Sequence, residues 1–191
     1  MAVYVVSFQA FKSSDNKFML KEFAIASVNS EATYQWTIRP QVPLSSLSSE
    51  MQRRAQYLTD KIHGIPWISG ANKEEAVLEV VRGILKDASE VYIKGSERAK
   101  YMRDLLGDFP EITICDIDDY KEVKFAKKNP EVKCRFAGSK HQQLRCAYEQ
   151  AVRYRDALRS SGYSTECEGD IGGRVTSVSY THLTLPTIYS V

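Results

Sequence analysis

The sequence has few of the features that mark membrane-spanning or secreted proteins. Its apolar runs all fall short of the roughly 18 residues that a membrane-spanning helix needs, and its first residues lack the positive stretch of a secretory signal. Only 4 of the 191 residues are cysteines, a density far below that of small domains held together by disulfides. We therefore expect reduced thiols and an intracellular protein, cytoplasmic or nuclear, with no membrane partner.

The composition is that of a chain that can bury a core. Hydrophobic residues make up 43% of the sequence and charged residues 26%, and the mean hydropathy is -0.36. A chain of this length and composition is expected to form one domain. We place that domain at residues 1–162 and expect a short native segment at 163–177.

The last residues have a different character. Val178 to Thr187 read VSYTHLTLPT, which resembles the conceptual translation of a transposase-type sequencing adaptor. We expect residues 178–191 to be an adaptor-derived artefact and exclude them from reasoning about the fold. On this interpretation the native chain was cut short near residue 177; the alternative is a Thr-rich strand.

Positive charge is concentrated late in the chain. Residues 121–159 hold 11 basic and 4 acidic residues, whereas the first 120 residues carry a small negative excess. Such a segment can bind the phosphates of RNA or DNA, and a solvated helix face has the same pattern, so both interpretations stay open. The candidate phosphate contacts are Lys127, Lys128, Lys133, Arg135, Lys140 and Arg145.

The order of secondary structure follows from the apolar periodicity. β-Branched and aromatic runs predict a three-stranded antiparallel meander, with strands at 3–11, 18–29 and 32–39. Helices and strands then alternate: helix 48–62, a helix capped by Asn72 and Glu75 with an apolar face to Ala88, strand 90–94, helix 96–106, strand 112–117 and helix 140–160. This pattern predicts an α/β protein with a mixed sheet, in the order of a ribonuclease H-like fold.

Four segments resemble the DnaQ-like 3'-5' exonucleases of the DEDDh type. They read VYVVSFQAF, IHGIP, VYIKGSERAKYM and HQQLRCAYEQAVRYRDAL, and the resemblance covers about residues 2–160. It implies an Asp-x-Glu pair on the first strand, an Asp in the second motif and His-x4-Asp on the last helix. In that family the four carboxylates hold two metal ions that activate water and stabilise the leaving oxygen.

The carboxylates of that family are largely missing from this chain. Ser7 and Gln9 stand where the resemblance places Asp-x-Glu, and Cys146 stands five residues after His141 in place of the final Asp. Ser and Gln are neutral and bind hard divalent cations poorly, so we expect the Mg²⁺ or Mn²⁺ site to be lost. The sequence therefore predicts a pseudo-exonuclease that is not an enzyme, whatever His141 retains as a general base.

Other acids could restore a metal site. The second motif offers Glu97 or Arg98, and Asp116, Asp118 and Asp119 cluster at the end of a strand. Acids at a strand end are more often turn formers and helix caps, and we favour that interpretation.

Cysteine and histidine near the last helix suggest a different metal. Cys134, His141 and Cys146 have the spacing C-x6-H-x4-C, and His63 or a Glu would complete a tetrahedral zinc site. This arrangement loosely resembles the Maelstrom domain, a ribonuclease H-like module that lost its exonuclease carboxylates and gained a Glu/His/Cys/Cys zinc site. Alternatively, Cys146 is a buried small apolar residue and His141 a relic or a helix cap.

Several tyrosines could stack on bases but occur at positions that favour the core. We expect packing between sheet and helices for Tyr92, Tyr101, Tyr148 and Tyr154.

Three functional hypotheses follow from these residues. The first is a catalytically inactive exonuclease-like domain that binds nucleic acid weakly through residues 121–159. The second is a zinc-stabilised module that acts through a protein partner. The third is a residual metal-dependent 3'-5' exonuclease that uses other carboxylates such as Asp116 and Asp118. No cofactor is certain, and zinc is the candidate.

Overall fold

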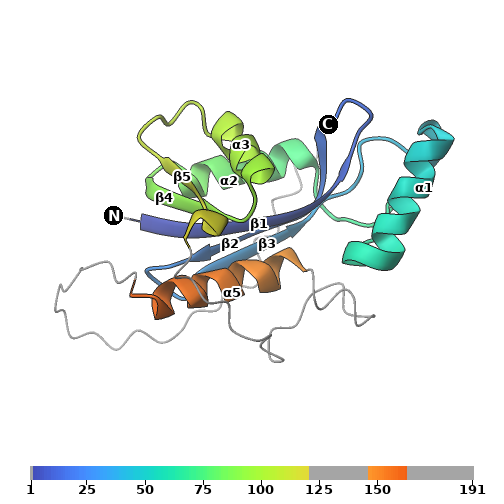
Figure 1. Ribbon diagram of the computed structural model, residues 1–191. Helices are drawn as coiled ribbons and strands as arrows, with labels where there is room; N and C mark the ends of the chain where they lie inside the picture. The colour runs from blue at the N-terminus through green and yellow to red at the C-terminus, as the bar shows by residue number, and fades with distance from the viewer. Residues whose placement is uncertain (1, 121–145, 163–191) are drawn as a thin grey trace.

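The computed structural model describes residues 2–120 and 146–162, and within them it has a five-stranded mixed sheet between two layers of helices. The strand order is β3-β2-β1-β4-β5. Figure 1 shows α2 and α3 on one face of the sheet and α5 on the other. The prediction of an α/β protein with a mixed sheet is confirmed.

The first three strands form the predicted antiparallel meander. β1 (Ala2–Lys12) pairs with β2 (Phe18–Ser27), which pairs in turn with β3 (Thr33–Thr37). Asn16 makes the first turn possible by adopting a left-handed conformation with φ 62°. β3 ends earlier than predicted, because Ile38 forms an isolated parallel bridge with the segment before α2.

The β1–β2 ladder contains one irregularity that matters for the charged residues. Gln9 pairs with Glu22 and Ala10 pairs with Leu20, so Lys21 is an extra residue between these pairs. An extra residue of this kind is a β-bulge, which bends a strand and re-aims its side chains. Lys21 and Glu22 are both buried, as is every residue from Leu20 to Ser27, because helices or loops cover both faces of this strand.

The second half of the sheet is parallel, as alternating helices and strands require. β4 (Ala88–Ile93) pairs with β1, and β5 (Thr113–Asp116) pairs with β4. The connections are α2 (Glu74–Leu85) and α3 (Ser96–Leu105), and α5 (Ala147–Ser160) crosses the opposite face.

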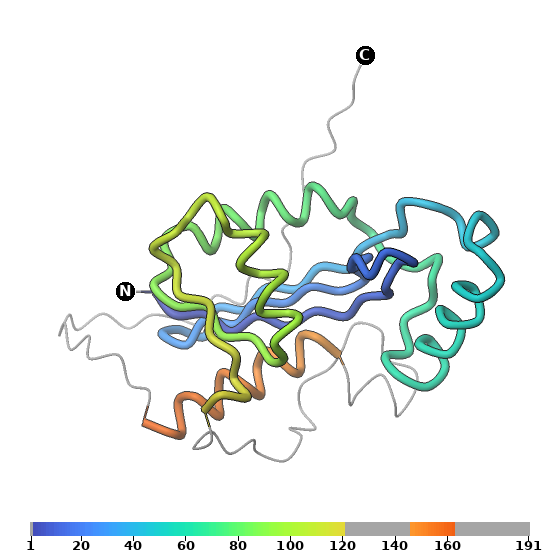
Figure 2. The backbone as a smooth tube through the Cα atoms, turned by 45° about the horizontal axis from the view of Figure 1, so that its top comes forward, coloured from blue at the N-terminus to red at the C-terminus, as the bar shows by residue number. Residues whose placement is uncertain are grey.

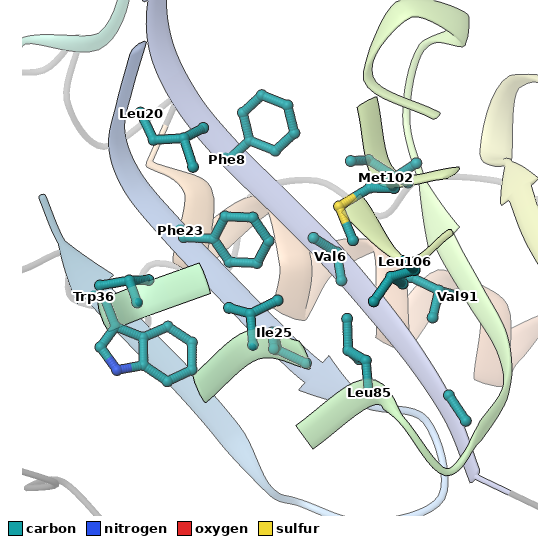
Figure 3. Packing of buried hydrophobic residues seen from close by; sticks show 14 of the residues in the cluster. Val6, Phe8, Leu20, Phe23, Ile25, Trp36, Leu85, Val91, Met102 and Leu106 are labelled. Atoms are coloured by element: carbon teal, nitrogen blue, oxygen red, sulfur yellow. The ribbon is translucent and has the colours of Figure 1, made fainter. Parts of the chain in front are cut away.

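The main core fills the space between the sheet and the α2/α3 layer (Figure 3). Phe8 is fully buried in it, stacked on Phe23 with 5.9 Å between ring centroids and in edge contact with Tyr101 at 5.3 Å. A second cluster between α5 and the sheet contains buried Tyr92 and Tyr154, and Tyr148 of α5 is half-buried against Ala24 and Ala26 of β2. The prediction that these four tyrosines belong to the core is confirmed.

Helix α1 (Ser49–Leu58) is placed differently from the other helices. It lies beside the end of the sheet (Figures 1 and 2), and Ala55 is its one buried residue. The Ser48 hydroxyl caps its start by accepting a hydrogen bond from the backbone N–H of Met51. A π-helical turn, Thr59–His63, follows it.

Two helix starts differ from the predictions. Asn72 does not cap α2; its side-chain amide donates to the Thr37 carbonyl, and the helix begins at Glu74 without a side-chain cap. Cys146 has an extended backbone and precedes α5, so the last helix begins at Ala147 rather than running through Cys146. The predicted part before residue 146 lies outside the described residues.

Within residues 2–120 and 146–162, no helix is both long enough and apolar enough to cross a membrane.

Candidate functional site

The face of the sheet under α5 carries a buried polar group instead of a continuous apolar surface. Ser7 and Gln9 alternate on β1 with residues of the main core, and 1% and 5% of their surfaces are exposed. The Ser7 hydroxyl donates to Oε1 of Gln150 on α5, 2.9 Å away. Ser7, one of the two positions of β1 where the resemblance to exonucleases would place a carboxylate, therefore contacts the last helix.

Glu22 on β2 is at the centre of this group. It is the register partner of Gln9 and is fully buried. Its Oε2 accepts from the backbone N–H of Ala147 at 2.9 Å, and its Oε1 accepts from the Gln35 amide at 2.7 Å and from the Cys146 thiol at 3.1 Å. The carboxyl group thus accepts from three donors, and the contacts with the Ala147 N–H and the Cys146 thiol are fully buried.

The electrostatics of Glu22 reflect two opposing effects. Burial raises the pKa of the Glu22 carboxyl, while the hydrogen bonds from Ala147, Cys146 and Gln35 act to lower it. The position also lies at the N-terminus of α5, where the helix dipole favours a negative charge.

Of the five positions of the family motif, the structure brings three together, and the second-motif candidates Glu97 and Arg98 are not among them. Ser7 contacts α5 through Gln150, Gln9 pairs with Glu22, and Cys146 contacts the Glu22 carboxyl. His141 lies outside the described residues. We call the group formed by Ser7, Gln9, Glu22, Cys146 and Gln150 the polar site.

The polar site does not suit the two hard metal ions of an exonuclease. Such ions need several carboxylate oxygens, and the Glu22 carboxyl is already engaged by three donors. Across residues 2–120 and 146–162, no group of three or more His, Cys, Asp or Glu side chains could hold a metal ion.

The contact between Cys146 and Glu22 is compatible with both residues binding one zinc ion. The Cys146 sulfur lies 3.1 Å from Oε1 of Glu22. In a tetrahedral zinc site with ordinary bond lengths these two atoms would be roughly 3.5 Å apart, so a small adjustment suffices. Cys134 and His141, the other candidate ligands, lie outside the described residues.

His63, the remaining zinc candidate, is held in the turn after α1. It is buried, its Nδ1 accepts from the backbone N–H of Ile65 at 3.1 Å, and its ring is edge-on to Phe11 at 5.0 Å. One of its two possible coordinating nitrogens is therefore already used by the turn.

The six proposed phosphate contacts, Lys127, Lys128, Lys133, Arg135, Lys140 and Arg145, all lie outside the described residues. Two later arginines of the basic segment have structural roles instead. Arg155 forms an ion pair with Glu31, and Arg159 binds the same carboxylate and the carbonyls of Val28 and Ser30. These contacts fasten α5 to the β2–β3 turn.

The aspartates after β5 behave as caps. Oδ1 of Asp116 accepts from the backbone N–H groups of Gly95 and Asp118, at 2.8 and 3.0 Å. Asp118 forms an ion pair with Lys94. The favoured interpretation of turn formation and capping is confirmed for Asp116.

The two candidates of the second motif have other partners. Glu97 forms an ion pair with Lys12, and the Arg98 guanidinium lies over the Phe8 ring, 5.3 Å from its centroid.

Sequence reasoning did not single out Glu22. The available signal was its position in FMLKEFAIAS, where two adjacent charges interrupt an otherwise apolar strand. Buried charges in a strand need specific partners, so such an interruption indicates a polar contact that the sequence alone does not identify.

A scan against protein-family models finds no match to this chain, and a search of curated proteins finds no match either.

Proposed function

We propose that the chain is a catalytically inactive domain of ribonuclease H-like, DnaQ-like descent. The observation that carries the proposal is the meeting of Ser7, Gln9 and Cys146 around one sheet–helix contact, at positions where the resemblance calls for metal-binding carboxylates. The strand order β3-β2-β1-β4-β5, with β2 antiparallel to β1, supports the fold assignment.

The chemistry of the polar site supports inactivity. Neutral Ser7 and Gln9 supply no negative charge to a divalent cation, and the hydrogen bonds of Glu22 serve the start of α5. On this proposal the ancestral position of the metal ions has become part of the interior, where it stabilises the packing of α5.

The test is a search for 3'-end shortening by the full chain. End-labelled single-stranded and duplex RNA and DNA are incubated with it in magnesium or manganese, beside an active exonuclease as the positive control. We expect no shortening. Metal-dependent shortening that disappears in Glu22→Gln, in His141→Ala or in the double variant Asp116→Asn/Asp118→Asn would overturn the proposal. Shortening that all of these variants retain would indicate a contaminating nuclease.

Weak nucleic-acid binding through residues 121–159 is the associated activity that we propose. Phosphate contacts make the logarithm of affinity fall with the logarithm of salt concentration, with a slope of about 0.9 per neutralised phosphate on duplex DNA. We expect a steep slope that becomes shallower when Lys127 and Lys128 are replaced by Gln, and a flat salt response would contradict this part of the proposal.

A zinc-stabilised interaction module is a second candidate, favoured by the contact between Glu22 and Cys146. We propose these two residues as ligands together with Cys134 and His141. Bound zinc would fix the segment that carries Cys134 and His141 against the sheet, and the resulting surface would meet a protein partner.

Metal analysis of the full chain tests this candidate. We expect about stoichiometric zinc in the native protein and loss of it in Cys146→Ser and Glu22→Gln. Cys115→Ser is the matched control, because Cys115 is also a buried free thiol but lies on β5. A metal-free native protein, or equal zinc in Cys146→Ser and native protein, would reject it.

A further inference from the structure

The connection between β3 and α2, residues 39–73, differs in charge from the sequence around it. It holds 5 basic and 2 acidic residues, whereas the remainder of residues 1–120 holds 9 basic and 15 acidic ones. Its basic residues are Arg39, Arg53, Arg54, Lys61 and Lys73. The ion pairs among residues 2–120 and 146–162 involve none of these five. The connection is therefore a positive region beside an otherwise negative part of the chain.

Helix α1 and the turn after it place three of these cations around one exposed aromatic ring. Tyr57 on α1 is 59% exposed, and Arg53 and Arg54 lie four and three residues before it. Lys61 lies four residues after Tyr57, in the π-helical turn. Residues three and four apart are neighbours on a helix surface, so the three cations surround the ring. All three are exposed, and we call Arg53, Arg54, Tyr57 and Lys61 the α1 face.

The other side of α1 faces the protein and fixes the direction of the α1 face. Ala55 is buried in a cluster with Phe11 and Trp67, and Leu58 packs against that cluster. Figure 2 shows α1 at one end of the described part of the molecule, beside the sheet and not over either of its faces. The α1 face is therefore directed away from the core, where a large partner can reach it.

Cations around an exposed ring suit a single-stranded nucleic acid. Arg and Lys bind backbone phosphates, and a Tyr ring offers a flat surface on which an unpaired base stacks. The bases of a duplex are already stacked on one another and leave the ring without a partner. A membrane fits less well, because a membrane-binding helix has a whole apolar face to insert. Helix α1, all of which the structure describes, exposes one large hydrophobic residue, Tyr57.

Two acids on the same helical segment limit the strength of such binding. The Asp60 carboxylate accepts hydrogen bonds from the Gln56 amide at 2.9 Å, and Glu50 lies in the first turn of α1. Against them stand the three cations of the α1 face. We therefore expect weak binding that depends on the Tyr57 ring as well as on charge.

We propose that the α1 face binds a single-stranded nucleic acid, with backbone phosphates against Arg53, Arg54 and Lys61 and one base stacked on Tyr57. Phosphates and base faces are common to RNA and DNA, so the α1 face does not distinguish the two sugars. The surface is separate from residues 121–159, and the inference does not rest on the binding proposed for that segment.

The charge of the α1 face is tested by fluorescence anisotropy with the full chain. The probes are labelled oligo(U) and oligo(dU) of equal length and a duplex of that length, each titrated at several salt concentrations. We expect both single strands to bind with similar affinity. In Arg53→Gln/Arg54→Gln the affinity should fall, and the slope of its logarithm against that of salt should become shallower by about 1.4, since each neutralised phosphate of a single strand contributes about 0.7.

Lys86→Gln/Lys100→Gln is the matched control. Both lysines are exposed and outside the described ion pairs, and they belong to the α2/α3 layer, so the same charge is removed elsewhere. This pair should leave affinity and slope unchanged. Equal effects of the two double variants, or no binding of single strands by the native chain, would overturn the proposal.

The ring is tested by two substitutions of Tyr57. Tyr57→Ala should weaken single-strand binding about fivefold or more and leave duplex binding unchanged, because it removes the stacking surface. Tyr57→Phe keeps the ring and should bind like the native chain. Native affinity in Tyr57→Ala would contradict the proposal.

Two further outcomes separate this inference from its alternatives. Binding that is lost in Lys127→Gln/Lys128→Gln and unaffected by the α1 substitutions would support the segment 121–159 and reject the α1 face, and the converse result would do the opposite. Binding of phosphatidylserine vesicles that is lost in Arg53→Gln/Arg54→Gln, without binding of oligonucleotides, would assign the α1 face to a membrane and overturn the proposal.

Discussion

The carboxyl group of Glu22 on β2 accepts a hydrogen bond from the backbone N–H of Ala147, so a strand residue caps a helix that begins 125 residues later. A helix start leaves backbone donors without intrahelical partners, and Cys146 supplies no side-chain cap for α5. This long-range cap fixes where α5 begins and which part of it faces the sheet.

Removing that carboxyl group should destabilise the protein. Glu22→Ala leaves the buried N–H of Ala147 without its acceptor, which costs about 1–3 kcal/mol, and also removes an acceptor from the half-buried amide of Gln35. We expect the free energy of unfolding, measured by urea denaturation, to fall by about 2 kcal/mol or more. Glu79→Ala on the exposed side of α2 is the control, with an expected change within about 0.5 kcal/mol. Equal effects of the two substitutions would contradict the capping role.

Burial of Lys21 should be visible in the pH dependence of stability. Its pKa is about 8 in the folded protein and 10.5 in its ordinary state, so the unfolded chain binds more protons between these values. The free energy of unfolding should therefore rise as the pH is raised from about 8 to about 10.5. The same stability is lost when the pH is lowered back to about 8, where the folded protein also binds the proton. In Lys21→Met this rise should disappear; parallel pH profiles of the two proteins would be inconsistent with a buried, titrating amine.

The centre of the main core should tolerate truncation poorly. Phe8 is fully buried and contacts Phe23, Phe18 and Tyr101 through its ring. Phe8→Ala should lower the free energy of unfolding by about 3–5 kcal/mol, because it removes buried area and leaves a cavity. Tyr57 on α1 is 59% exposed, so Tyr57→Ala should change the free energy of unfolding by about 0.5 kcal/mol or less in the same urea denaturation experiment.

Arg159 should matter more through backbone carbonyls than through its ion pair. The Glu31 side chain is 77% exposed, and exposed ion pairs contribute about 0–1 kcal/mol, so Glu31→Gln should have a small effect. Arg159→Ala also removes the hydrogen bonds to the carbonyls of Val28 and Ser30 and should cost about 1–3 kcal/mol. The two variants are compared by thermal unfolding at neutral pH, and a larger loss in Glu31→Gln would reverse this assignment.

Local periodicity was sufficient to predict most of the elements. The alternation of VYVVSFQAF and the apolar face from Val77 to Leu85 identify a strand and a helix without long-range information. The errors occur where a distant residue takes over. Asn72 has the sequence context of a helix cap, but its side chain binds the Thr37 carbonyl 35 residues earlier.

The polar site was only partly predictable, because it too depends on contacts between residues far apart in the sequence. The resemblance identified Ser7, Gln9 and Cys146 as positions of interest, and these residues do converge on one sheet–helix contact. Glu22 could not be inferred, because its role depends on the β1–β2 register and on the placement of α5. The bulge at Lys21 likewise depends on the β1–β2 register and has no recognisable sequence pattern.

The bulge also determines how β2 would respond to a change in its length. Leu20 and Glu22 pair with adjacent residues of β1, so a chain that lacked Lys21 would keep the other pairs of the ladder and restore regular alternation. Deletion of a residue between Phe23 and Ser27 would instead shift the strand by one position and exchange its two faces. Lys21 is therefore the residue of β2 whose deletion the sheet can accept. The residue that carries the buried amine is an insertion into a strand that would be regular without it.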